Sequence, residues 1–180
     1  MGTARVALLR GINVGGKNKL PMRDLVALFE EAKCRNVRTL IQSGNVVFTA
    51  RAKACGGLAA GIASKISERF GYTTPLILRT ADQLRDVIAN NPFLTPEANE
   101  DSLHVMFLAD RPAPAKVAAL DPNRSSPDRF TVRGQDVYLH LPNGVAKTKL
   151  SNAWFDSKLG TTSTVRNWRT VNRLLAMMDE

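Results

Sequence analysis

The order of apolar patterns in the first 80 residues is the feature that most constrains the fold. Short apolar runs predict strands at residues 6–9, 37–42, 45–49 and 74–78, and apolar residues at helical spacing predict helices that begin at Pro21 and Leu58. Ser43 and Gly44 fit a tight turn between the second and third strands. The resulting order, β-α-β-β-α-β, is typical of a ferredoxin-like unit, an antiparallel sheet with helices on one face.

The second half of the chain has a variant of this pattern. Thr80 and Gln83 fit a capping box for a helix that ends near residue 90. Further patterns predict a strand at 103–108, a short helix at 114–120, a hairpin of strands 130–133 and 136–141, and helices at 152–159 and 165–178. We therefore predict an α+β protein of two small subdomains. Residues 1–79 form the ferredoxin-like one, and residues 80–180 form a second with C-terminal helices.

The composition excludes several classes of protein. A chain of 180 residues with 44% hydrophobic and 23% charged residues is typical of one or two globular domains. Cys34 and Cys55 lie far apart and outside any CxxC pair, which argues against a disulfide scaffold and a zinc ribbon. The absence of a signal peptide and of a long apolar stretch predicts a cytoplasmic protein with no membrane partner. No metal-ligand cluster and no GxGxxG motif is found, so we expect no metal and no cofactor.

The charge of the chain favours an anionic partner. Lys and Arg number 25 against 16 Asp and Glu, a formal net charge of +9. Residues 1–23 and 32–67 contain no acidic residue, and residues 137–175 contain only Asp156. These basic stretches coincide with Gly, Asn, Ser and Thr residues, which hydrogen-bond anions, although a solvated surface is the ordinary alternative.

The glycine-rich segment Gly11–Leu20 carries the most specific signal. Gly11–Asn18 fits the phosphate-binding pattern GxxxxGK, but Asn18 lacks the hydroxyl that would hold Mg²⁺, and Pro21 delays the helix. Anion binding by backbone N–H groups and a purely structural glycine loop both stay open. In a ferredoxin-like unit this loop and the 42–45 turn share one sheet edge, so we expect them to be neighbours. The candidate ligand-binding residues are Arg10, Asn13, Gly15, Gly16, Lys17, Lys19, Gln42, Ser43 and Asn45.

A second basic region lies near the C-terminus. Thr164 is the best placed N-cap of the predicted helix 165–178, which would put Arg166 in the first turn, where the helix dipole disfavours a cation. An anion shared by Arg166 and the free N–H groups would resolve this conflict, and pairing with acids from elsewhere is the alternative. The candidates for a second basic surface, which could face the first, are Lys147, Lys149, Arg166 and Asn167.

Several of these blocks resemble a known family. Ala7–Asn18, Leu20–Met22, Ile41–Asn45, and Arg166–Trp168 with Thr170 resemble a bacterial family catalogued as domain of unknown function 1697, over essentially the whole chain. The loop at Lys147–Leu150 departs from the Ser-Lys-Leu expected for the family, because Thr148 replaces the serine. The resemblance implies a compact α+β protein of two similar subdomains, and it supplies no reaction.

These observations together predict a protein that binds an anionic ligand through basic glycine-rich loops. The ligand classes that fit are a nucleotide, a phosphorylated small molecule and a nucleic acid. One alternative is a small enzyme acting on a phosphorylated substrate, in which Lys17 and Arg166 stabilise developing charge. Another is a protein-interaction module with a basic face. The sequence contains no recognisable set of acid, base and metal ligands, so the question of catalysis stays open.

Overall fold

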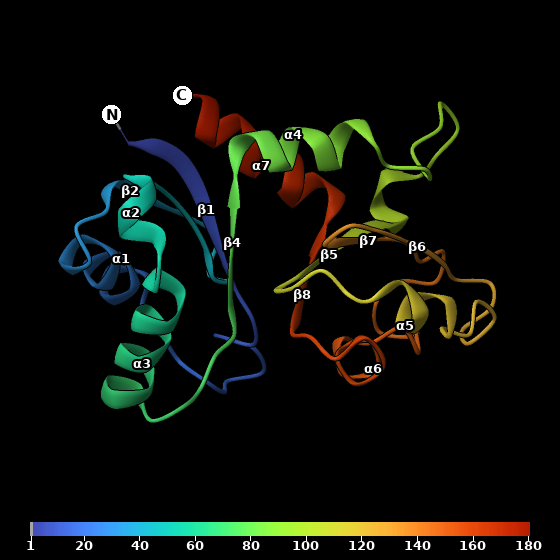
Figure 1. Ribbon diagram of the computed structural model, residues 1–180, viewed down its shortest axis with the longest axis horizontal. Helices are drawn as coiled ribbons and strands as arrows, with labels where there is room; N and C mark the ends of the chain where they lie inside the picture. Colours follow the sequence, from blue (N-terminus) through green and yellow to red (C-terminus); the bar gives the residue numbers. More distant parts are fainter. Residues whose placement is uncertain (1) are drawn as a thin grey trace. The chain divides into compact units, whose positions relative to one another are not determined.

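The computed structural model in Figure 1 describes residues 2–180, and its contacts divide the chain into two compact units. The first unit runs to Arg85 and also includes Leu174–Glu180, and the second is Asp86–Arg173. The division falls within two helices, α4 (Ala81–Ala89) and α7 (Trp168–Asp179). The subdomain boundary between residues 79 and 80 stays a prediction.

The first unit contains a four-stranded antiparallel sheet in the order β2-β3-β1-β4. Ala7 of the central strand β1 lies opposite Val46 of β3 on one side and Leu78 of β4 on the other. This is the predicted ferredoxin-like order. The elements are β1 (Thr3–Leu9), α1 (Met22–Glu31), β2 (Arg35–Leu40), β3 (Asn45–Ala50), α2 (Ala52–Cys55), α3 (Leu58–Phe70) and β4 (Leu76–Thr80).

The core of the first unit lies between this sheet and the helices α1 and α3, which cover one face (Figure 1). Alternate residues of a strand point to the same face, so Ala7 and Leu9 both reach this core. Phe29 of α1 packs against Phe48 of β3 with ring centroids 5.1 Å apart. The capping box is confirmed, because Gln83 N donates to Thr80 Oγ1 and Thr80 N donates to the Gln83 side chain.

The second unit repeats the same sheet order, β6-β7-β5-β8, again antiparallel. Its helix α6 packs Trp154 and Phe155 against Phe130 of β6 on one face of the sheet. Two ferredoxin-like subdomains in an α+β fold are thus confirmed. The elements are a 3-10 turn η1 (Glu100–Ser102), β5 (Leu103–Leu108), α5 (Pro114–Ala118), β6 (Arg129–Arg133), β7 (Asp136–His140), α6 (Asn152–Leu159) and β8 (Ser163–Asn167).

The predicted helix 165–178 is wrong at its start. Residues 163–167 form strand β8, which pairs with β5, and α7 begins only at Trp168. The N-cap is therefore Asn167, whose Oδ1 accepts a hydrogen bond from Thr170 N at 2.8 Å, and not Thr164. The apolar helical stripe begins at Trp168, and the preceding Ser-Thr-Val run has β-branched residues that favour a strand when a partner edge is present.

The described residues 2–180 contain no helix of the length and apolarity needed to cross a membrane.

Candidate functional site

The glycine-rich segment folds as a small hairpin that projects from the end of β1. Lys17 N donates to Val14 O at 3.0 Å, and Gly15 and Gly16 form the turn with φ of 56° and 74°. Two positive φ values at these positions match a primed type I turn, which glycine adopts without strain. Within residues 2–180 the backbone N–H groups of these two glycines have no hydrogen-bond acceptor, so both can donate to a ligand.

Two asparagines hold this hairpin in place. Asn13 Nδ2 donates to Leu20 O at 2.9 Å and to Gln42 O at 3.0 Å, and Asn13 Oδ1 accepts from Leu20 N at 2.8 Å. Asn18 Nδ2 donates to Gly11 O at 2.8 Å. Both N–H donors of the Asn13 amide are therefore used within the protein. Asn13 organises the loop, and the α1 helix begins only at Met22, so the loop is not a P-loop running directly into a helix.

The turn between β2 and β3 lies beside the glycine loop, as expected from the topology. Gly44, with φ of 79°, accepts a hydrogen bond from Leu9 N at 2.8 Å, and a Cβ on Gly44 would lie 2.8 Å from Leu9 Cβ. Asn45 is fully buried, and its Nδ2 donates to Leu40 O and Ser43 Oγ. Of the three candidate residues on this turn, only Gln42 is exposed, while the side chains of Ser43 and Asn45 are hydrogen-bonded to each other.

The loop and the turn border an open hollow of about 600 Å³. Four of the predicted residues line it, Asn13, Gly16, Lys19 and Gln42, while Arg10, Gly15 and Lys17 lie on the same loop outside its wall. The rest of the lining was not predicted from the sequence, in which a Leu-Pro-Met run followed by a cation was the available signal. These missed residues are Leu20, Pro21, Met22 and Arg23.

The cations of this hollow have no acidic residue within its wall. Arg23 Nε lies 3.5 Å from Asp24 Oδ1, but the Arg23 side chain is 88% exposed, so this contact is weak. Lys19 is exposed and pairs with no acid in the described chain. Positive charge, free backbone donors and the apolar Leu20–Met22 segment thus meet in one hollow, a combination that suits an anion with an apolar part.

The positive charge of the chain belongs mostly to the first unit. This unit contains fourteen Lys and Arg against seven Asp and Glu, whereas the second contains eleven against nine. The first unit therefore carries +7 of the net charge of +9. The field that would attract an anion is concentrated around the glycine-loop unit.

Arg166 lies in strand β8, so the prediction that places it in the first turn of a helix is wrong. Its Nη1 donates to Thr164 Oγ1 and to Val165 O, both at 2.8 Å, and burial lowers its pKa to about 10. Val165 packs on the α6 side of the second sheet, so the next residue, Arg166, points to the opposite face. Asn167 is occupied in capping α7.

Lys147 and Lys149 lie on an exposed loop that follows β7 and is anchored by Leu150 on the α6 side of the sheet. Thr148, like the serine of the family pattern, has a side-chain hydroxyl. Its Oγ1 accepts a hydrogen bond from Leu150 N at 3.0 Å. The structure thus does not gather these two lysines around the Arg166 side chain. That this second region faces the glycine loop stays a prediction.

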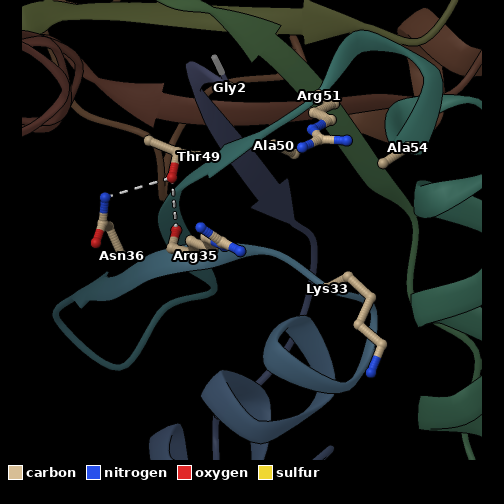
Figure 2. Close-up of a pocket in the computed structure, with 8 residues that line it drawn as sticks. All are labelled: Gly2, Lys33, Arg35, Asn36, Thr49, Ala50, Arg51 and Ala54. Carbon is tan, nitrogen blue, oxygen red and sulfur yellow. Dashed lines mark hydrogen bonds between the residues drawn. The ribbon is translucent and has the colours of Figure 1, made fainter.

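A second basic cavity, which the sequence analysis did not identify as a site, lies at the opposite end of the first sheet (Figure 2). It has a volume of about 640 Å³. The acid-free stretch at residues 32–67 was the sequence signal for it. Its lining is Gly2, Lys33, Arg35, Asn36, Thr49, Ala50, Arg51 and Ala54.

The fold and these loops define an α+β protein of two units with the same sheet order, in which the first unit is basic and contains the glycine loop. A family model described as "Protein of unknown function (DUF1697)" matches residues 2–138, and the chain belongs to this family. The Arg166–Trp168 block lies beyond the matched residues. No curated protein matches the chain.

One solved structure that resembles this chain is that of the conserved bacterial protein SP0830 from Streptococcus pneumoniae. The two are 19% identical, with a TM-score of 0.73 and 99% of each chain covered. At this identity the likeness concerns the fold, and it extends over both units.

Proposed function

We propose that this protein binds a phosphorylated small molecule, such as a nucleotide, in the hollow beside the glycine loop. The observation that carries the proposal is the convergence of Lys19 and Arg23 with Gly16 in a hollow whose wall contains no acid. A cation and a backbone N–H group can each donate to phosphate oxygens. The volume of about 600 Å³ falls in the range of small-molecule sites, and the Leu20–Met22 segment supplies an apolar contact.

Binding is favoured over catalysis because, in the part of the chain that the structure describes, Lys19 and Arg23 are the only titratable side chains that line the hollow. Neither has a neighbouring general base in the wall. An enzymatic role therefore has no observation in its favour at this site.

Solution NMR of the full chain can test the proposal at the residues concerned. Pyrophosphate, AMP and adenosine are titrated separately while the amide signals of Gly15 and Gly16 are followed. We expect the two phosphate compounds to shift these signals and adenosine to shift them only weakly. The double variant Lys19→Ala, Arg23→Ala should weaken the apparent affinity roughly a hundredfold, since each charged hydrogen bond contributes about 1.5 kcal/mol or more.

The control variant is Lys158→Ala, which removes an exposed charge of the second unit. It should change the dissociation constant by less than about twofold, because exposed charges interact weakly at a distance. Equal weakening by Lys158→Ala would mean that only the overall charge attracts the ligand. Glycine signals that do not move with any phosphate compound would refute the proposal.

A further inference from the structure

We propose that the basic cavity of Figure 2 is a second binding site, which takes an anion that contains phosphate and carries at least two negative charges in total. It is separate from the glycine-loop hollow and uses none of its residues. The cavity lies where β1 and β2 begin and β3 ends, whereas the hollow lies at their other ends. β1 has seven residues, so at about 3.3 Å per residue the two sites are on the order of 20 Å apart.

Among residues 2–180, three cations and no acid line this cavity. Lys33, Arg35 and Arg51 have no ion pair or hydrogen bond from their side chains to the described residues 2–180. Figure 2 shows the guanidinium groups of Arg35 and Arg51 extending to the same side of the strands, with the Lys33 side chain along the same border. Guanidinium groups match the geometry of phosphate and carboxylate oxygens through paired hydrogen bonds, which a chloride ion cannot form.

The nearby acids are occupied elsewhere. Glu31 accepts hydrogen bonds from Lys65 at 2.9 Å and from Arg69 at 2.8 Å and 3.1 Å. These two partners hold the pKa of Glu31 at about 2, with the hydrogen bond from Arg69 as the largest cause. Arg38, the next cation of β2, contacts Glu180. The cations Lys33, Arg35 and Arg51 can therefore interact with an external anion.

A β-bulge places Arg35 at the cavity. Arg35 pairs with Thr49 and Arg38 pairs with Val47, so two residues of β2 lie opposite Phe48 alone. Cross-strand partners share a face, and the bulge therefore sets Arg35 beside Thr49 and away from the core face occupied by Phe48. Thr49 Oγ1 donates to Arg35 O at 3.1 Å, which fixes this position. Bulges at sheet edges commonly aim a side chain at a site.

Lys33 occupies a position that glycine normally takes. Lys33 N donates to Glu30 O and Cys34 N donates to Phe29 O, the bonding pattern of a Schellman motif that ends α1. The φ of Lys33 is 65°, a left-handed conformation that is strained for a residue with a side chain. The strained position of Lys33 supports a role for its charge in binding, because strained residues concentrate at binding sites.

The test follows the amide signals of Thr49 and Ala50 by NMR during titration with pyrophosphate, which separates this site from the glycine loop. We expect these signals to shift, and Arg35→Gln and Arg51→Gln each to weaken binding about tenfold or more. Lys53→Gln is the matched control. It removes the same charge from α2, two residues from Arg51, but Lys53 does not line the cavity. It should change the dissociation constant less than about twofold.

A short oligodeoxythymidylate distinguishes the sources of the phosphate. If it shifts the same signals and Arg51→Gln lowers the slope of log K against log salt by about 0.7, the phosphate is that of a nucleic-acid backbone. If pyrophosphate shifts the Thr49 and Ala50 signals and the oligonucleotide does not, the phosphate is that of a small molecule. Either result supports the site. Equal weakening by Lys53→Gln, or Thr49 and Ala50 signals that stay fixed with millimolar pyrophosphate and with oligonucleotide, would overturn it.

Discussion

Lys33→Gly should make the protein more stable while it weakens anion binding at the basic cavity. Lys33 has a φ of 65° at the position that ends α1, where glycine has no steric penalty. The left-handed conformation costs a residue with a side chain about 1–2 kcal/mol. Glycine also raises the conformational entropy of the unfolded chain, which lowers the free energy of unfolding by about 0.4–1 kcal/mol. The difference predicts a rise of roughly 1 kcal/mol in the free energy of unfolding.

Urea denaturation followed by circular dichroism measures this change, and pyrophosphate titration of the same variant measures binding. Because stability and affinity move in opposite directions, a loss of affinity cannot be explained by unfolding. Ile41→Gly is the matched control, since Ile41 also has a positive φ, of 51°, but lies on the β2–β3 turn and outside the cavity. It should stabilise the chain and leave the pyrophosphate affinity at Thr49 unchanged. A Lys33→Gly variant that is less stable than the parent would refute the reasoning about backbone strain.

Three further predictions concern the stability of the fold. Gly44→Ala should lower the free energy of unfolding by about 3 kcal/mol in urea titrations, since its Cβ would lie 2.8 Å from a core side chain at a φ of 79°. Asn167→Ala should cost about 1 kcal/mol through loss of the α7 cap, and an unchanged urea midpoint would contradict that assignment. Glu31 has its pKa lowered from 4.5 to about 2, so its stabilising contribution is complete above pH 4.5 and is lost as the pH falls through 2. The difference in urea midpoint between wild type and Glu31→Gln should therefore shrink steadily as the pH falls from 4.5 to 2, and a difference as large at pH 2 as at pH 7 would contradict it.

The order of elements could be predicted from sequence because it depends on local signals. Apolar periodicity and the Thr80–Gln83 capping box suffice to locate most strands and helices. The contact between the glycine loop and the 42–45 turn followed from topology alone. Strand β8 could not be predicted in the same way. Its Ser-Thr-Val-Arg sequence is locally ambiguous, and pairing with β5, far away in the sequence, decides it.

The candidate residues were less predictable than the fold, because the same side chain can bind a ligand or support the backbone. Asn13 and Asn45 have the amide groups that a ligand site needs, yet their Nδ2 groups donate to neighbouring carbonyl groups of the loop and the turn. The basic cavity escaped prediction for a different reason. It depends on a bulge at Asn36 and Val37, which is a property of strand register and leaves no mark in the local sequence.

Comparison with the second unit shows which features of the first unit the shared fold requires. Both have the same strand order and a helix-covered core, but the second connects β5 to α5 by a short segment without glycine, and β6 pairs with β7 without a bulge. The fold therefore requires neither the glycine hairpin nor the bulge of β2.

The distribution of backbone strain follows the same division. In residues 2–180, every residue other than glycine with a positive φ belongs to the first unit: Asn13, Asn18, Lys33, Asn36 and Ile41. Two lie in the glycine loop, two line the basic cavity, and Ile41 lies on the turn beside the loop. The left-handed conformation strains Lys33 and Ile41 most, because asparagine tolerates it better, and the second unit forms the same sheet order without such residues. Strain and the +7 charge thus concentrate in one of two equivalent scaffolds, which is the expected pattern if ligand binding is carried by the first unit.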